Sequence, residues 1–218
     1  MVGNITCSYI VQQLKLQPIG YVDSVLLPQV MVVHNSKPLP PIQVFGGTSI
    51  VLFLSEVPLA TRFSMEFSRA VAAWAKSVRA DNVIGVSGLP STRREEAPDG
   101  RPSVLAISAD DKTLGSVTSI GVMPFEEGLV TGTHASLLKE CMKIGQRCLL
   151  LLAESLIQFP DPVSASNAVE VLGKLLGVKI DLEPLLREAE EIRLRNRELM
   201  QQTQVAQQPV QQPASAYR

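Results

Sequence analysis

The sequence has little cysteine and no excess of charge of either sign, and each shortage excludes a class of protein. Its 218 residues include three cysteines, Cys7, Cys141 and Cys148, which are too few and too scattered for a disulfide framework or a CxxC metal site. Basic and acidic side chains nearly balance, 20 against 21. Because such a chain has no net field to attract nucleic acid phosphates or an anionic membrane surface, we expect neither partner.

Long hydrophobic runs are also missing. The most apolar segment, residues 148–153, is far too short to cross a bilayer. Met1 is followed by neither a basic region nor a long apolar stretch, so we expect no signal peptide. With 45% hydrophobic and 19% charged residues, the chain suits one globular domain, and we expect a soluble cytoplasmic protein.

Signatures of common enzymes are absent from the sequence as well. It contains no GxxxxGK[ST] loop, GxGxxG fingerprint, HExxH helix or GxSxG elbow. His134 at a predicted strand-to-helix junction, and Glu154 and Asp161 on either side of a predicted loop, could still act in acid–base catalysis. Asp161 is also placed to cap a helix, and a residue in the position of His134 commonly lies in the first turn of one. Since nothing combines a nucleophile, a base and an orienting group, we predict no catalytic residues, no metal and no cofactor.

What the sequence does contain is an alternation of apolar runs with amphipathic segments. Helices are predicted at residues 5–14, 60–79, 133–143 and 162–176, with Thr133 and Asp161 as caps, and a long helix from Leu182 to about Gln202. Strands are predicted at residues 30–33, 49–54, 82–86, 103–108, 128–131 and 148–153, the second of them buried on both faces. This alternation is typical of α/β proteins with a mainly parallel sheet covered on both sides.

Two further segments are predicted to be connections. Residues 37–41 (KPLPP) are rich in proline, which blocks both helices and strand ladders, so we expect a turn or an extended linker. Residues 91–102 (STRREEAPDGRP) are polar, charged and rich in structure breakers. That composition predicts an exposed and mobile loop.

The end of the sequence departs from the globular pattern. From Leu182 to Leu199 apolar residues alternate at spacings of three and four, with Asn196 in the seam. This pattern fits pairing with a second helix, and it fits equally a helix packed on its own domain. Residues 201–212 hold seven glutamines, a composition that favours a flexible tether. We divide the chain into an α/β domain (residues 1–180), a helix for oligomerisation or packing (181–202) and a flexible glutamine-rich tail (203–218).

The last three residues, Ala216, Tyr217 and Arg218, resemble the hydrophobic-tyrosine-X motif of proteasome activators and of some proteasome assembly factors. A free α-carboxylate can form charge-assisted bonds with a lysine and backbone N–H groups in a pocket. The tyrosine before it adds a rigid ring with a hydroxyl group, while the identity of the final side chain matters little. We predict that these three residues bind a partner and that the tether allows them to reach it.

A series of different short motifs also runs along the chain from Val2 to about Met200. They are Val2-Gly3-Asn4, Leu27-Pro28, Lys37-Pro38-Leu39-Pro40-Pro41-Ile42, Ser55-Glu56-Val57-Pro58, Gly88-Leu89-Pro90, Leu152-Ala153-Glu154, Asp161-Pro162 with Ala165 and Ala168, Leu176-Gly177, and Glu188-Ala189-Glu190. With these motifs the chain resembles the proteasome assembly chaperone 2 family, especially its archaeal members. The resemblance implies a three-layer α/β/α sandwich similar to nucleoside phosphorylases, self-association, and binding to core proteasome α-subunits.

The resemblance thus implies a non-enzymatic, homo-oligomeric chaperone or adaptor that assists proteasome assembly or activation. The alternative is an enzyme of nucleoside phosphorylase-like or ATP-grasp-like type acting on a small molecule, a label that the family has also carried. A coiled-coil adaptor for an unrelated partner is a third reading. Similar proteins have a first strand and a Gly-Pro-Gly type turn before the position of Met1. Either the start codon is assigned too late, or the sheet has lost this strand, and in the second case we expect an exposed sheet edge.

Overall fold

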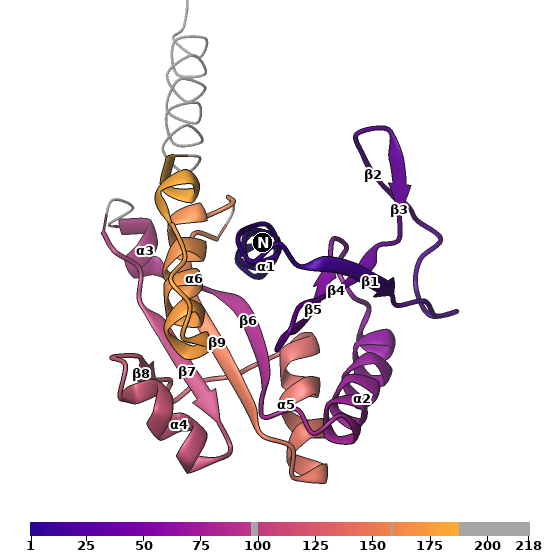
Figure 1. Cartoon of the computed structure of the whole chain (residues 1–218). Helices are drawn as coiled ribbons and strands as arrows, with labels where there is room; N and C mark the ends of the chain where they lie inside the picture. Colours follow the sequence, from indigo (N-terminus) through magenta and orange to yellow (C-terminus); the bar gives the residue numbers. More distant parts are fainter. Residues whose placement is uncertain (97–99, 158, 188–218) are drawn as a thin grey trace, which may run out of the picture.

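The computed structural model describes residues 1–96, 100–157 and 159–187, which form an α/β structure (Figure 1). The helices are α1 (Val2–Gln13), α2 (Thr61–Ser77), α3 (Thr92–Glu96), α4 (Asp111–Thr118), α5 (Gly132–Ile144) and α6 (Pro162–Leu176). The strands are β1 (Gln17–Tyr21), β2 (Val32–His34), β3 (Lys37–Leu39), β4 (Ile42–Gly46), β5 (Val51–Ser55), β6 (Val83–Pro90), β7 (Val104–Ser108), β8 (Met123–Pro124) and β9 (Cys148–Ser155).

The strands form two sheets and a separate hairpin. One sheet is antiparallel, in the order β1-β4-β5, and the hairpin pairs β2 with β3. The second sheet has the order β6-β9-β7-β8, with β6 parallel to β9, β8 parallel to β7, and β7 antiparallel to β9. The α/β class is confirmed, and the four-stranded sheet is mainly parallel as expected, since β6–β9 and β7–β8 are parallel and β7–β9 alone is antiparallel in it. The antiparallel β1-β4-β5 sheet was not expected.

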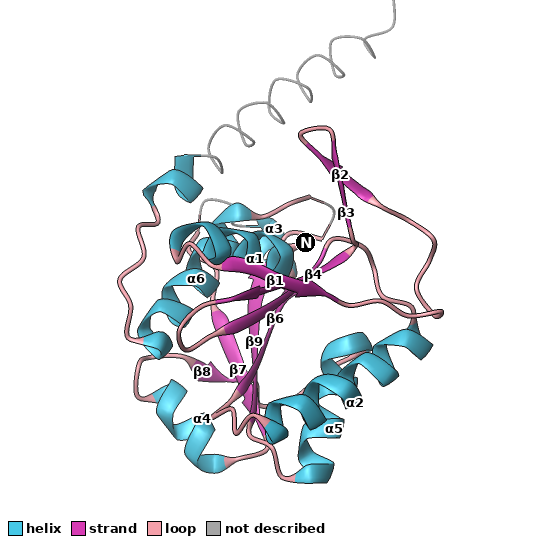
Figure 2. Cartoon of the chain, turned by 45° about the vertical axis from the view of Figure 1, so that its right-hand side comes forward, coloured by secondary structure: helices cyan, strands magenta, loops and turns pink. Residues whose placement is uncertain are grey.

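Side chains on opposite faces of the strands build two separate hydrophobic cores, which makes the molecule three-layered (Figure 2). On β9, Leu149 and Leu151 join the core beneath α1, α4 and α6. Their neighbours Cys148 and Leu150 join the core beneath α2 and α5. Strand β9 is buried on both faces because helices cover both, which explains its continuous apolar sequence.

Most of the long predicted elements are present, whereas the short ones differ. Helix α4 was not predicted, because its sequence, DKTLGSVT, has few apolar residues and a central glycine; Asp110 caps it by accepting a 2.7 Å hydrogen bond from the Thr113 N–H. No strand is found at residues 128–131, and the strand of that region is β8 instead. Burial on both faces of β5 is found in part: Leu52 and Leu54 are buried in one core, while Phe53 is half-buried and packs against the other.

The proline-rich segment is part of a strand pair rather than a linker. Pro38 in β3 lies opposite Val33 in β2. Proline is tolerated there because β2 is the one strand that pairs with β3 in the part of the chain that the structure describes, so the outer side of β3 needs no donor. The hairpin projects from the rest of the molecule (Figure 1).

Strands β5 and β6 each end a sheet, and helix α1 contacts both of them. The Asn4 side-chain amide donates a hydrogen bond to the Ser55 carbonyl at the end of β5, with a nitrogen–oxygen distance of 3.0 Å. Gly3 lies so close to β6 that a Cβ atom there would be 2.3 Å from the Val86 carbonyl oxygen. Helix α1 therefore covers part of the edges of both sheets.

The beginning of the predicted C-terminal helix packs on its own domain. Residues 183–187 are helical, and Leu185 is buried in the core that contains α1 and α6. The Tyr9 hydroxyl donates a 2.5 Å hydrogen bond to the Asp181 carbonyl, which fixes the approach to this helix. The rest of the predicted helix and tail, including Ala216, Tyr217 and Arg218, lies outside the described residues. No helix in the described ranges is long and apolar enough to span a membrane.

Candidate functional site

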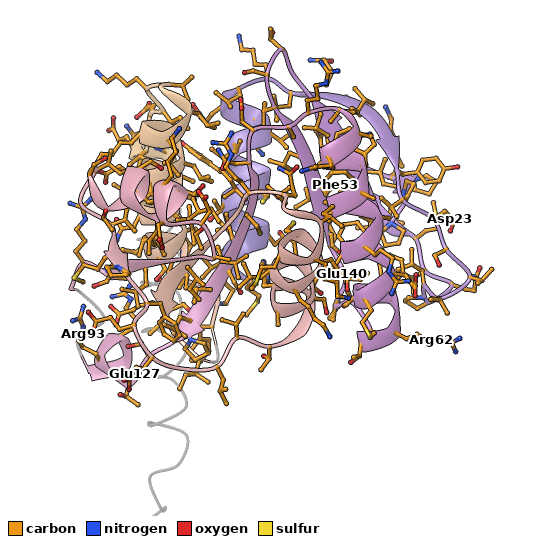
Figure 3. The ribbon with its side chains drawn as sticks, turned by 90° about the horizontal axis from the view of Figure 1, so that it is seen from below. Asp23, Phe53, Arg62, Arg93, Glu127 and Glu140 are labelled. Carbon is orange, nitrogen blue, oxygen red and sulfur yellow. The ribbon has the colours of Figure 1, made fainter. Side chains whose placement is uncertain are left out.

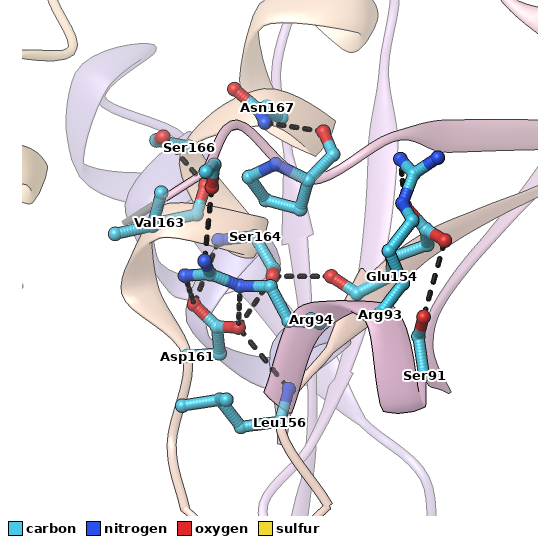
Figure 4. A network of polar contacts seen from close by, with 12 residues as sticks. Ser91, Arg93, Arg94, Glu154, Leu156, Asp161, Val163, Ser164, Ser166 and Asn167 are labelled. Carbon is cyan, nitrogen blue, oxygen red and sulfur yellow. Dashed lines mark hydrogen bonds and ion pairs between the residues drawn. The ribbon is translucent and has the colours of Figure 1, made fainter. Parts of the chain in front are cut away.

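Asp161 is the centre of a buried polar network where β9 ends and α6 begins (Figure 4). Its carboxylate forms two hydrogen bonds with the Arg94 guanidinium, of 2.9 and 3.1 Å. It also accepts a 3.1 Å bond from the Ser164 N–H, as the cap of α6, and a 3.2 Å bond from the Leu156 N–H. The Arg94 and Asp161 side chains are only 4% and 1% exposed. The prediction that Asp161 caps a helix is confirmed.

The surroundings of Asp161 keep it ionised. Burial alone would raise its pKa, but the hydrogen bonds from Arg94 and Ser164 and the charge of Arg94 together hold the pKa below its ordinary value. A carboxylate with this many donors is a structural anchor, because an acid–base catalyst needs a proton-accepting position that substrate can reach.

Glu154 fastens the neighbouring stretch of chain to the end of β9. Its carboxylate accepts hydrogen bonds of 2.8 Å from Arg93, 3.0 Å from the Ser103 N–H and 3.2 Å from the Ser91 hydroxyl. Burial would raise its pKa, but the Ser103 and Ser91 hydrogen bonds and the charge of Arg93 lower it overall. Figure 3 shows Arg93 on the outer surface of this region.

These two anchors correct part of the prediction for residues 91–102: Arg94 is buried, whereas Thr92, Arg93, Gly100 and Arg101 are exposed as predicted. The segment begins with α3, and Arg94 on that helix is buried against α6. The Arg94 guanidinium also donates a 2.9 Å hydrogen bond to the Gly100 carbonyl, which folds the segment back on itself. Arg93 and Arg94 of this hydrophilic segment belong to the polar network, and hydrophilicity alone does not reveal that Arg94 is buried.

His134 lies in the first turn of α5, beneath β6. Burial lowers its pKa, and a hydrogen bond to the Val86 backbone opposes that shift without cancelling it. The ring also packs against Gly85, where a Cβ atom would come within 2.8 Å of it. The helix begins after Thr131, so the prediction that Thr133 caps it is wrong; the Thr133 hydroxyl instead contacts the Ser64 hydroxyl on α2 at 2.8 Å.

His134, Glu154 and Asp161, the three candidate catalytic residues, therefore make separate structural contacts. His134 meets β6, Glu154 holds the ends of the segment between β6 and β7, and Asp161 holds α3 to α6. No hydrogen bond or ion pair connects His134 to either carboxylate within the described ranges. Nor do the described residues contain a group of three or more His, Cys, Asp or Glu side chains that could hold a metal ion.

Comparison of the sequence with known protein families shows which family the chain belongs to. Residues 1–200 match the model of the PAC2 family. The chain belongs to the PAC2 family. A relative from Methanocaldococcus jannaschii, the uncharacterized protein MJ0106, is 24% identical over 204 residues, which cover 93% of this chain and 82% of the relative.

Solved structures show the same PAC2 fold. PbaA from Pyrococcus furiosus, an archaeal homolog of proteasome-assembly chaperone, is 30% identical and superimposes with a TM-score of 0.84, covering 94% of this chain and 84% of PbaA. PbaB from the same organism, an archaeal proteasome activator, is 18% identical with a TM-score of 0.78, covering 91% of this chain and 88% of PbaB. At that lower identity the likeness concerns the fold.

Proposed function

We propose that this PAC2 protein is a non-enzymatic, homo-oligomeric chaperone or adaptor of the cytoplasm, which binds core proteasome α-subunits and assists proteasome assembly or activation. The observation that carries the proposal is the 30% identity to PbaA over 94% of the chain, together with the TM-score of 0.84. PbaA is an archaeal homolog of proteasome-assembly chaperone, and an identity of this size along almost the whole chain supports a related role here.

The binding element in this proposal is the C-terminal tail with Ala216, Tyr217 and Arg218. Leu185 is buried in the core that contains α1 and α6, so the described chain is anchored to the body up to that helix. The terminal carboxylate binds a lysine in a proteasome pocket, and the Tyr217 ring packs beside it. Several tails on one oligomer raise the overall affinity even when each single contact is weak.

The environment of the acid–base candidates supports the non-enzymatic part of the proposal. Asp161 and Glu154 accept hydrogen bonds from several protein donors, and His134 is engaged by the Val86 backbone. The competing enzyme hypothesis predicts turnover of nucleosides with phosphate, or of ATP with amino acids. We expect no product in either assay from protein that binds proteasomes, and measurable turnover would favour the enzyme.

The tail mechanism is tested by capturing purified core proteasomes on the immobilised full-length protein. We expect Tyr217→Ala to reduce capture about 10- to 100-fold, because the aromatic ring is lost from a small buried contact. The matched control is Arg218→Ala, which keeps the terminal carboxylate and should capture proteasomes as the wild type does. Equal capture by wild type and Tyr217→Ala would refute the tail mechanism.

A further inference from the structure

One side of the molecule carries apolar side chains that the described body leaves in contact with solvent. All five residues of β1 are exposed. Ile19 and Tyr21 in β1, Val25 in the following segment, and Met31 and Val33 at the β2–β3 hairpin have exposed fractions between 57% and 96%. In Figure 1 the hairpin rises beside β1, away from the helical layers. We call residues 17–36, which contain these side chains, the arm surface.

The exposed part of the arm surface has the composition of an interface, whereas Leu27 of the same range is buried in a core with Ile42 and Phe63. In residues 17–36 the only side chain with a full charge is Asp23, although charged residues make up 19% of the whole chain. Asp23 lies at the outer margin of this side of the molecule (Figure 3), where its carboxylate accepts a 2.8 Å hydrogen bond from the Ser24 N–H. Protein interfaces have charge-depleted centres that are rich in tyrosine and methionine, with polar groups at the rim.

The hairpin is held in position although little of it is buried. Its strands have three residues each, and an isolated two-stranded hairpin is marginally stable in water. The His34 imidazole contacts the Glu56 carboxylate at 2.7 Å, and the Gln43 amide donates a 2.9 Å hydrogen bond to the other oxygen of Glu56. This contact ties the hairpin to β4 and to the end of β5, so Met31 and Val33 are presented from a fixed base.

The outer edge of β1 limits how a partner can add to it. Pro18 has no N–H group to donate, and the β1–β4 register shifts between Pro18 and Gly20. A long strand ladder along this edge is therefore interrupted, and contact through the side chains of Ile19 and Tyr21 is favoured. The arm surface is thus suited to packing against another apolar surface.

We propose that the arm surface is the contact through which two copies of this chain associate, each hairpin packing on β1 of the other copy. A surface with one charge in 20 residues can meet itself without like-charge repulsion, whereas a charged partner would lose its solvation there. A projecting hairpin next to an exposed strand also provides both halves of a contact related by a two-fold axis. The inference rests on the proposed homo-oligomer and names the surface that forms it.

The experiment measures the molar mass of the full-length protein by sedimentation over a range of concentrations. Met31→Glu and Val33→Glu each place a charge in the contact of both copies. We expect each substitution to raise the dissociation constant at least about 30-fold. Met142→Glu on α5 is the control, because Met142 is 58% exposed, as much as Met31, and lies outside the arm surface. It should associate as the wild type does.

Hydrogen exchange of the wild type provides a second readout that needs no substitution. The amides of β2 and β3 should gain protection as the protein is concentrated through its association range, while those of α4 stay unchanged. The proposal would be overturned if the wild type is monomeric or if the oligomer persists in both Met31→Glu and Val33→Glu. It would also be overturned if the exchange of the hairpin amides does not depend on protein concentration. Proteasome capture by the same variants separates the two ideas, because loss of the arm contact weakens avidity and leaves single-tail binding intact.

Discussion

Asp161 joins three segments of the chain through one side chain. It caps α6, holds the Leu156 N–H, and pairs with Arg94 from α3. The sequence predicts the cap, because an aspartate followed by Pro162 is a standard helix start. It does not predict Arg94 as the partner, since Arg94 stands 67 positions away and its neighbours are typical of an exposed loop.

Replacing Asp161 should destabilise the protein strongly. Asp161→Asn leaves the buried Arg94 charge without its counterion, so we expect the free energy of unfolding to fall by about 3–5 kcal/mol. The control is Asp81→Asn, which removes a 3.1 Å ion pair with Arg147 at a carboxylate that is 91% exposed. Urea denaturation should show almost no shift for the control, and similar shifts for the two variants would contradict the account.

The same pair makes the effect of Asp161→Asn depend on pH. Because the pKa of Asp161 is lowered in the folded state, its contribution is complete above the pKa of the unfolded chain, about 3.9, and is lost as pH falls through the lower folded value. The difference in unfolding free energy between wild type and variant should therefore stay constant from about pH 7 to 5 and shrink below about pH 4. A difference that already disappears between about pH 7 and 5 would show that another group is responsible.

At the scale of elements, α1 depends on a close approach to β6. Gly3 faces the Val86 carbonyl oxygen, and no side chain fits between them. One turn further along α1, the Thr6 hydroxyl donates a 3.5 Å hydrogen bond to the Ala165 carbonyl, so α1 is also set against α6. Gly3 is therefore needed in the first turn of α1 because a side chain would not fit against β6, and not because of its backbone conformation.

Two glycine-to-alanine substitutions test that reason. Alanine favours helices, so Gly115→Ala in α4, where a Cβ atom meets nothing within 4 Å, should stabilise the protein by about 0.5–1 kcal/mol. Gly3→Ala should instead destabilise it by about 1–3 kcal/mol, because the new methyl group displaces α1 from β6. Thermal unfolding of both variants gives the comparison, and equal stabilisation by the two would disprove close packing at Gly3.

The sequence predicts elements well where side chains repeat with a long, regular period. The amphipathic pattern of α2 and the apolar run of β9 gave helix and strand close to their observed bounds. Shorter elements have too few residues for a period to show, as in the two-residue β8 and in α4. Strand β3 was not predicted, because proline normally interrupts a strand. Pro38 is tolerated in β3 because its backbone nitrogen faces the side away from β2, which the sequence does not reveal.

At the scale of the whole molecule, the family and the fold agree with the motifs that run along the chain. The three layers place α1, α4 and α6 on one face of the strands and α2 and α5 on the other (Figure 2). The arm surface could not have been identified from sequence, because alternating apolar residues in a strand look alike whether they face a core or solvent. The proposed proteasome contact at Ala216, Tyr217 and Arg218 is a prediction from the sequence, since those residues lie outside the described structure.

The most direct test of the proposed function is the dissociation constant for core proteasomes of the natural chain and of a chain extended by Gly-Ser-Gly after Arg218. The extension removes no side chain and displaces only the terminal carboxylate. We expect affinity to fall about 10- to 100-fold, the effect of losing a charge-assisted hydrogen bond of about 1.5–3 kcal/mol. Equal affinity of the two chains would contradict the account, because the carboxylate would then have no part in binding.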